Sequence, residues 1–205
     1  MTSNTTMTLD KKLVLFDFDG TITTRDTFIE FIRFVSGAPK FYLGFMFLLP
    51  VLILYKLKLI KNWRAKEIVF AFFFKGMPEK TFQSYGDVYA TAQLPKLIRP
   101  KALQKIEEHR AAGDEIYLVT ASSAAWIQSW ANTVGITILG TQWAVADGKI
   151  TGRIDGINCY GIEKVNRIKR AIDLSKFGTI VAYGDTRGDR EMLALAHESN
   201  YRAFH

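Results

Sequence analysis

Short apolar runs alternate with amphipathic stretches along most of the chain. The apolar runs have the length of buried strands, and the amphipathic stretches have the length and spacing of helices. The runs predict strands at residues 13–16, 115–120, 136–139, 179–183 and 200–204. The stretches predict helices at residues 26–35, 61–75, 101–111, 122–134, 161–172 and 188–196, another helix from Pro78, and a hairpin at 145–150. Since strands that alternate with helices pair in parallel through right-handed crossovers, we expect an α/β fold with a doubly wound, Rossmann-like parallel sheet.

One long helical segment interrupts this alternation. It contains the run Phe41–Tyr55, fifteen residues without a charge. A membrane-spanning helix needs about 17–25 such residues, and this run also contains Gly44 and Pro50. We therefore predict a core made of residues 1–25 and 94–205, with residues 26–93 inserted as a helical domain.

The net charge of +7 is concentrated in the insert. Between Arg33 and Lys75 there are eight Lys and Arg residues and one acid, Glu67, so this segment carries +7 and the other residues sum to zero. The single cysteine, Cys159, excludes a disulfide framework and a cysteine-rich zinc site.

Acidic residues follow two of the predicted strands, and a threonine ends a third. Ligands bind at the carboxyl ends of strands in an open parallel sheet. We therefore expect six side chains to share one crevice: Asp17, Asp19, Thr120, Lys164, Asp185 and Asp189. Carboxylates this crowded repel one another, and oxygen ligands of this kind favour Mg²⁺ beside a phosphate.

These residue types suit phosphoryl transfer. A carboxylate can attack a phosphoryl group to give an aspartyl-phosphate, and a second carboxylate two residues on can pass a proton to the leaving oxygen. Gly20 allows a sharp turn whose N–H groups face a phosphate. Each residue alone has a structural explanation, as a turn, a helix cap or a solvated side chain. Their shared position at strand ends and helix starts favours a catalytic site.

Four segments, in order, resemble the motifs of haloacid dehalogenase-superfamily phosphatases: DFDGTIT at 17–23, Thr120, Lys164 and GDTRGD at 184–189. The insert lies where the phosphoserine-phosphatase-like branch, subfamily IB, carries a helical C1 cap. Its aliphatic and basic composition is similar to the cap of phosphatidylglycerophosphatase C. The sequence departs from phosphoserine phosphatases at Gly188, where they usually have Asn.

The resemblance implies a role for each residue. It implies that Asp17 is the nucleophile and that Asp19 is the general acid and base. It implies that Mg²⁺ is held by Asp17, the Asp19 carbonyl and Asp185, and that Asp189 supports the water shell of the metal. The phosphate-binding residues that it implies are Gly20, Thr120, Ala121 and Lys164. Asp26 falls where phosphoserine phosphatases carry an acid that meets the amino group of the substrate.

Three interpretations of the apolar run are open. The run packs as the cap's own core, it docks on a bilayer with the basic residues at the headgroups, or it forms a dimer seam. We expect a cytoplasmic protein, and the second interpretation adds contact with the inner face of the membrane. We predict no nucleic-acid partner, and the oligomeric state is open.

Three functions follow. The first is a Mg²⁺-dependent phosphomonoesterase acting on a phospholipid head-group phosphate such as phosphatidylglycerophosphate. The second is the same chemistry on a small soluble phosphate such as phosphoserine, and transfer to an acceptor other than water stays open for both. The third is a phosphoacceptor signalling domain, which the motif order disfavours because Lys164 precedes the last acids.

Overall fold

A computed structural model describes residues 11–205 and shows a six-stranded sheet in the order β4-β3-β2-β1-β5-β6. All neighbouring strands are parallel except β3 and β4, which form an antiparallel hairpin. The strands are β1 (Lys12–Phe16), β2 (Glu115–Ser123), β3 (Thr137–Ala146), β4 (Lys149–Asp155), β5 (Thr179–Gly184) and β6 (Glu198–Tyr201). The predicted α/β fold with a doubly wound sheet is confirmed.

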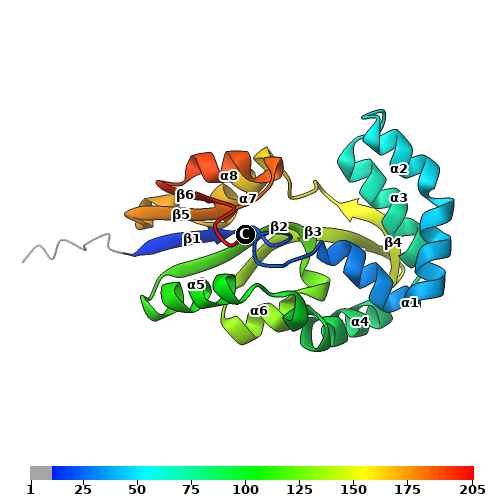
Figure 1. Cartoon of the computed structure of the whole chain (residues 1–205), viewed down its shortest axis with the longest axis horizontal. Coiled ribbons are helices and arrows are strands. Elements are labelled where there is room, and N and C mark those ends of the chain that lie inside the picture. Colours follow the sequence, from blue (N-terminus) through cyan, green and yellow to red (C-terminus); the bar gives the residue numbers. More distant parts are fainter. Residues whose placement is uncertain (1–10) are drawn as a thin grey trace, which may run out of the picture.

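The central strand β1 is buried on both faces. Val14 and Phe16 belong to one apolar core, and Leu13 and Leu15 belong to another on the opposite face. Helices cover each face of the sheet, as Figure 1 shows. The first core is covered by α5 (Pro100–Ala111) and α6 (Gln128–Val134), and the second by α7 (Ile162–Ala171) and α8 (Arg190–Leu195). Burial on both faces explains why β1 is a continuous apolar run rather than an alternating one.

Four helices follow β1 before the chain returns to the sheet. They are α1 (Thr27–Phe47), α2 (Leu49–Lys56), α3 (Asn62–Phe74) and α4 (Glu79–Ala92). Asp26 caps the first of them, because its carboxylate accepts a hydrogen bond from the Ile29 N–H at 3.2 Å. The backbone of α1 breaks at Gly37, where φ is 71°, two residues before Pro39. The predicted helix at 26–35 is thus the first half of α1.

The four inserted helices are tied to the rest of the chain at several points. The two connecting segments pair with each other, through a bridge between Thr23 and Ile98. Helix α3 packs on β4 so closely that Gly152 has no room for a side chain, since a Cβ there would lie 2.5 Å from the Cβ of Ala71. The ring of Phe70 on α3 stacks against the ring of Trp143 on β3. The division at residues 25/26 and 93/94 stays a prediction.

The sequence pattern misplaced some element boundaries. The helix expected at 122–134 begins only at Gln128, because β2 continues to Ser123 through a register shift beyond Thr120. The strand expected at 136–139 continues to Ala146, because its second half pairs with β4. The turn at Asp147-Gly148 is confirmed, and both residues have positive φ (50° and 69°).

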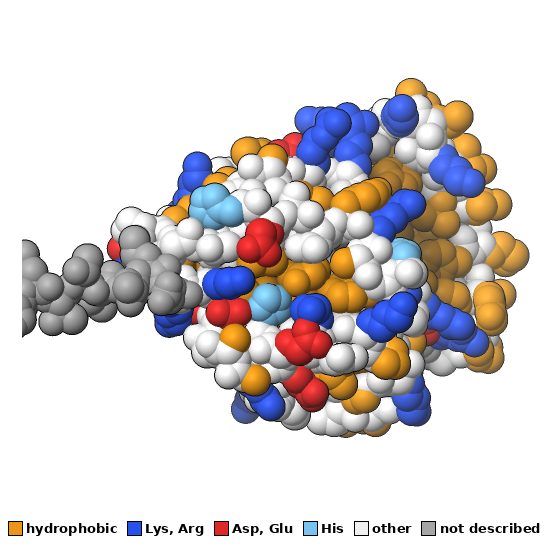
Figure 2. Space-filling model, turned by 60° about the vertical axis from the view of Figure 1, so that its left-hand side comes forward, with side chains coloured by type: hydrophobic (Ala, Val, Ile, Leu, Met, Phe, Trp, Pro, Cys, Tyr) orange, Lys and Arg blue, Asp and Glu red, His pale blue; other side chains and the backbone are white. Residues whose placement is uncertain are grey.

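The apolar run is only partly buried. Phe41, Phe45, Leu48, Val51 and Leu52 pack against the main core, so the interpretation as cap core holds for these residues alone. Other large side chains of residues 42–59 are exposed, and we call them the apolar face: Tyr42, Leu43, Met46, Phe47, Leu49, Ile53, Leu54, Tyr55, Leu57 and Leu59. In Figure 2, hydrophobic side chains crowd the right-hand side of the molecule with Lys and Arg among them.

Of the described helices, none by itself has the length and apolar composition of a membrane span. Helices α1 and α2 meet that test only as a pair, across a bend of 57°.

Candidate active site

Three carboxylates and one ammonium group converge where β1 and β5 end. Carboxylate oxygens of Asp17, Asp185 and Asp189 lie within 4.8 Å of one another. Lys164, at the start of α7, donates to Asp17 Oδ1 and to Asp189 Oδ1, both at 2.6 Å. All four side chains are largely buried. The parallel pairing of β1 with β5 brings these residues together, although 172 positions separate Asp17 from Asp189 in sequence.

Burial and mutual repulsion control the charges of this cluster. Burial raises the pKa of Asp17 to about 7, with a further contribution from the charge of Asp189, and Lys164 offsets these effects only in part. Burial alone would lower the pKa of Lys164, but the charges of Asp17 and Asp189 outweigh it and raise that pKa above its usual value. One cation therefore leaves the cluster short of positive charge.

The cluster fits a hard divalent cation. Asp189 is already saturated, because its Oδ2 accepts from the Thr186 hydroxyl and from the N–H groups of Thr186 and Asp185. Asp185 Oδ1 has only the Thr21 hydroxyl at 3.1 Å, and burial raises the pKa of Asp185. Asp17 and Asp185 thus keep free lone pairs for a metal, and Asp189 supports the loop around it. This agrees with the sequence expectation, and the individual roles stay predictions.

Gly20 is required by the geometry of this cluster. Its φ is 87°, and a Cβ at this position would lie 2.4 Å from Asp185 Oδ2. Any side chain here would push into a carboxylate expected to hold the metal.

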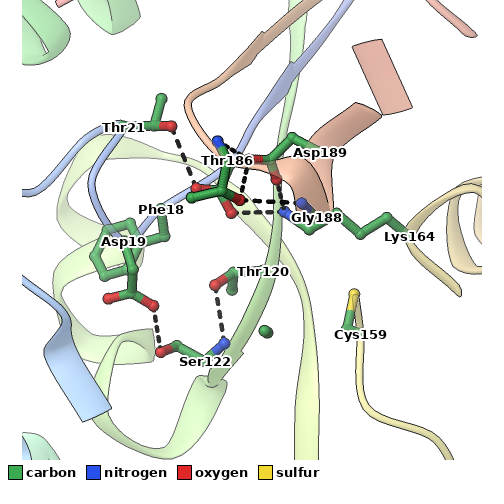
Figure 3. A network of polar contacts seen from close by, with 12 residues as sticks. Phe18, Asp19, Thr21, Thr120, Ser122, Cys159, Lys164, Thr186, Gly188 and Asp189 are labelled. Atoms are coloured by element: carbon green, nitrogen blue, oxygen red, sulfur yellow. Dashed lines mark hydrogen bonds and ion pairs between the residues drawn. The ribbon is translucent and has the colours of Figure 1, made fainter. Parts of the chain in front are cut away.

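The Asp19 carboxylate lies apart from the cluster around Asp17. Asp17 and Asp19 both line one cleft of about 320 Å³. Asp19 Oδ1 accepts from the N–H and the hydroxyl of Thr27, both at 2.6 Å, and Asp19 Oδ2 accepts from Ser122 Oγ at 2.5 Å. Figure 3 shows Asp19 turned toward Ser122, away from Lys164 and Asp189. The sequence reasoning missed Thr27 and Ser122. Their only sequence signal is a hydroxyl residue at a helix start or after a strand.

The predicted phosphate-binding residues Thr120 and Ala121 lie in the last part of β2, in the same region. The register of β2 shifts beyond Thr120, and Ala121 and Ser122 line the cleft. Thr120 itself is fully buried outside the lining, and its Oγ1 accepts a hydrogen bond from the Ser122 N–H at 2.9 Å. In this structure the hydroxyl of Thr120 therefore supports the irregular end of β2, and phosphate binding by it stays a prediction.

The unusual Gly188 is explained by Tyr160, which the sequence reasoning missed. A Cβ on Gly188 would lie 2.3 Å from the Tyr160 ring. Tyr160 lines the cleft, and its ring occupies the space that a side chain at position 188 would need. With Tyr160 in this position, only glycine fits at position 188.

Residues from the inserted helices complete the cleft. Asp26 lines it, as expected, and loss of hydration together with the charge of Asp19 raises the pKa of Asp26 to about 6. Lys66 on α3 reaches the core and donates to the Ala121 carbonyl at 2.6 Å. The apolar part of the wall comes from Phe45, Leu52 and Tyr55.

Comparison with known proteins agrees with this geometry. The haloacid dehalogenase-like hydrolase family matches residues 14–194. The chain belongs to this family. It is 37% identical to Protein CicA of Caulobacter vibrioides over 198 residues, which cover 94% of this chain and 86% of that protein.

Solved structures share the fold. A protein of unknown function from Bordetella pertussis Tohama I has a TM-score of 0.79 at 21% identity, covering 91% of this chain and 87% of that one. A substrate-bound phosphoserine phosphatase has a TM-score of 0.62 at 20% identity, covering 94% and 86%. The resemblance to haloacid dehalogenase-superfamily phosphatases is confirmed: the protein is a haloacid dehalogenase-type phosphatase, a phosphoric monoester hydrolase. The signalling-domain alternative is therefore wrong. The similarity of its insert to the cap of phosphatidylglycerophosphatase C stays a prediction.

We predict that Lys164→Met destabilises the fold by about 3–5 kcal/mol, since it leaves two buried carboxylates without their shared cation. Urea unfolding at pH 7 in metal-free buffer measures this. Lys169→Met, at an exposed position of the same helix, is the matched control and should stay within about 0.5 kcal/mol of the wild type. A loss below about 1 kcal/mol for Lys164→Met would contradict the charge balance described above.

Proposed function

We propose that the protein is a Mg²⁺-dependent phosphomonoesterase that removes a head-group phosphate from a phospholipid such as phosphatidylglycerophosphate. One observation carries the proposal. The cleft that contains Asp17 and Asp19 is walled by Phe45, Leu52 and Tyr55, from the segment whose outer side chains form the apolar face. A substrate with a phosphate at one end and acyl chains at the other matches such a cleft.

The polar residues supply the chemistry. Asp17 attacks the phosphorus atom, the bond to the leaving oxygen breaks, and Asp19 gives that oxygen a proton. Water then attacks the aspartyl-phosphate, Asp19 takes a proton from the water, and inorganic phosphate leaves. Asp17, Asp185 and the Asp19 carbonyl would hold Mg²⁺, which would supply the positive charge that the cluster lacks. Lys164 holds Asp17 in place and attracts the phosphate.

We further propose that the apolar face docks on an anionic bilayer. Five cations lie within or beside it and are exposed: Lys40, Lys56, Lys58, Lys61 and Arg64. Each contributes about 1 kcal/mol near an anionic leaflet. Each large apolar side chain contributes about 1.5–3 kcal/mol when it leaves water fully. Burial of the apolar side chains therefore contributes most of the affinity for the bilayer. The exposed cations make the protein prefer the anionic inner leaflet. Docking would hold the protein in the cytoplasm at the inner face of the membrane.

A small soluble phosphate such as phosphoserine is the second candidate. The shared fold with phosphoserine phosphatases and the position of Asp26 in the cleft favour it. The apolar wall and the aromatic Tyr160 favour the lipid.

The metal is tested by removal. We expect a chelator to abolish hydrolysis of 4-nitrophenyl phosphate and added Mg²⁺ to restore it, because one lysine does not neutralise the carboxylates. Ca²⁺ should restore little, since its looser coordination spoils in-line attack. Full activity in chelator would refute the metal site.

The docking surface is tested by charge reversal. We expect Lys56→Glu, Lys58→Glu and Lys61→Glu together to reduce flotation with anionic liposomes and turnover of lipid phosphate. Hydrolysis of 4-nitrophenyl phosphate should change less than about twofold, because these side chains lie outside the cleft lining. The control reverses Lys80, Lys101 and Lys169, which are exposed elsewhere and change the net charge equally. Absence of liposome binding by the wild type at low salt would contradict docking.

A further inference from the structure

Lys66 is a cation that the phosphatase chemistry does not use. It projects from α3 into the cleft that contains Asp17 and Asp19. Its Nζ donates to the Ala121 carbonyl at 2.6 Å and lies 5.1 Å from the centre of the Phe28 ring. The ammonium group has three N–H donors, so this hydrogen bond leaves two of them for a ligand.

The charge of Lys66 has no direct partner in residues 11–205. No carboxylate there lies within 4.0 Å of its Nζ, whereas the neighbouring Arg64 pairs with Glu67 at 2.9 Å. Loss of hydration lowers the pKa of Lys66, and the charges of Asp26 and Asp19 oppose this shift from farther away. A half-buried cation without an ion pair costs free energy, which an incoming anion would recover.

The scissile phosphate already has its own cation. Lys164, at the start of α7, contacts Asp17 directly. Lys66 lies on α3 in the insert and contacts Ala121 near the end of β2. Lys164 on α7 and Lys66 on α3 can therefore each attract one of two anionic groups in the same cleft.

We propose that Lys66 binds a second anionic group of the substrate, the phosphodiester of a phospholipid head group, while Asp17 receives the terminal phosphomonoester. This inference rests on the proposed phosphatase function and narrows its substrate class. A phosphodiester and a carboxylate present similar oxygens to an ammonium group, so the test separates a lipid head group from an amino-acid phosphate.

The experiment compares soluble substrates, so that membrane docking plays no part. Glycerophosphoglycerol phosphate has a monoester and a diester and no acyl chain, and glycerol 3-phosphate has the monoester alone. Phosphoserine adds a carboxylate, and phosphoethanolamine is its counterpart without one. Each is tested with the wild type, Lys66→Met, Lys66→Arg and the exposed control Lys80→Met.

For Lys66→Met, we expect KM for glycerophosphoglycerol phosphate to rise ten- to a hundredfold relative to KM for glycerol 3-phosphate. This range corresponds to about 1.5–3 kcal/mol for a hydrogen bond to a charged group. Lys66→Arg should restore most of the difference, and Lys80→Met should show none. If Lys66→Met instead raises KM for phosphoserine relative to KM for phosphoethanolamine, the assignment of a phosphodiester is wrong and the second anion is a carboxylate.

Equal effects of Lys66→Met on all four substrates would overturn the subsite and reduce Lys66 to a structural contact with Ala121. Equilibrium binding of glycerophosphoglycerol phosphate to Asp17→Asn protein, with and without Lys66→Met, gives a readout that needs no turnover. If the wild type hydrolyses none of the substrates, the proposed function fails, and this binding measurement still decides whether Lys66 holds the diester.

Discussion

The buried pairing of Lys164 with Asp17 and Asp189 is the interaction on which the rest of the site depends. It brings the ends of β1 and β5 and the start of α7 to one point. It is also incomplete, because burial still holds the pKa of Asp17 at about 7. Because three carboxylates surround one ammonium group, the folded state gains stability when a cation binds there.

The second constraint is the contact between the inserted helices and the core. Thr27 begins α1 and donates two hydrogen bonds to Asp19, and Lys66 on α3 donates to Ala121 near the end of β2. A movement of the insert would therefore disturb the Asp19 carboxylate and the end of β2 together. Under the proposed function, this coupling would let substrate contacts made by the insert affect the reacting groups directly. The apolar face lies on α1, α2 and the turn that follows, and α1 is also the helix whose first residue contacts Asp19.

Much of the fold could be predicted because its signals are local. The apolar runs at β1 and β5 and the Asp147-Gly148 turn are short-range patterns, and the motif acids follow strands. The extension of β2 past Thr120 could not be predicted, because strand pairing with β3 overrides the helical pattern there. Tyr160 and Lys66 reach the site through tertiary contacts that no spacing encodes. The split of the apolar run into buried and exposed halves depends on the break at Gly37 and the bend before α2.

The covalent intermediate on Asp17 is the central claim, and its location is the most direct test. The protein is mixed with a phosphomonoester, quenched in acid within milliseconds and digested, and the phosphorylated peptide is sequenced by mass spectrometry. We predict acid-stable, hydroxylamine-labile phosphate on Asp17 and none in Asp17→Asn, which should also lose turnover. Phosphate on another residue, or near-normal hydrolysis by Asp17→Asn, would contradict the assignment.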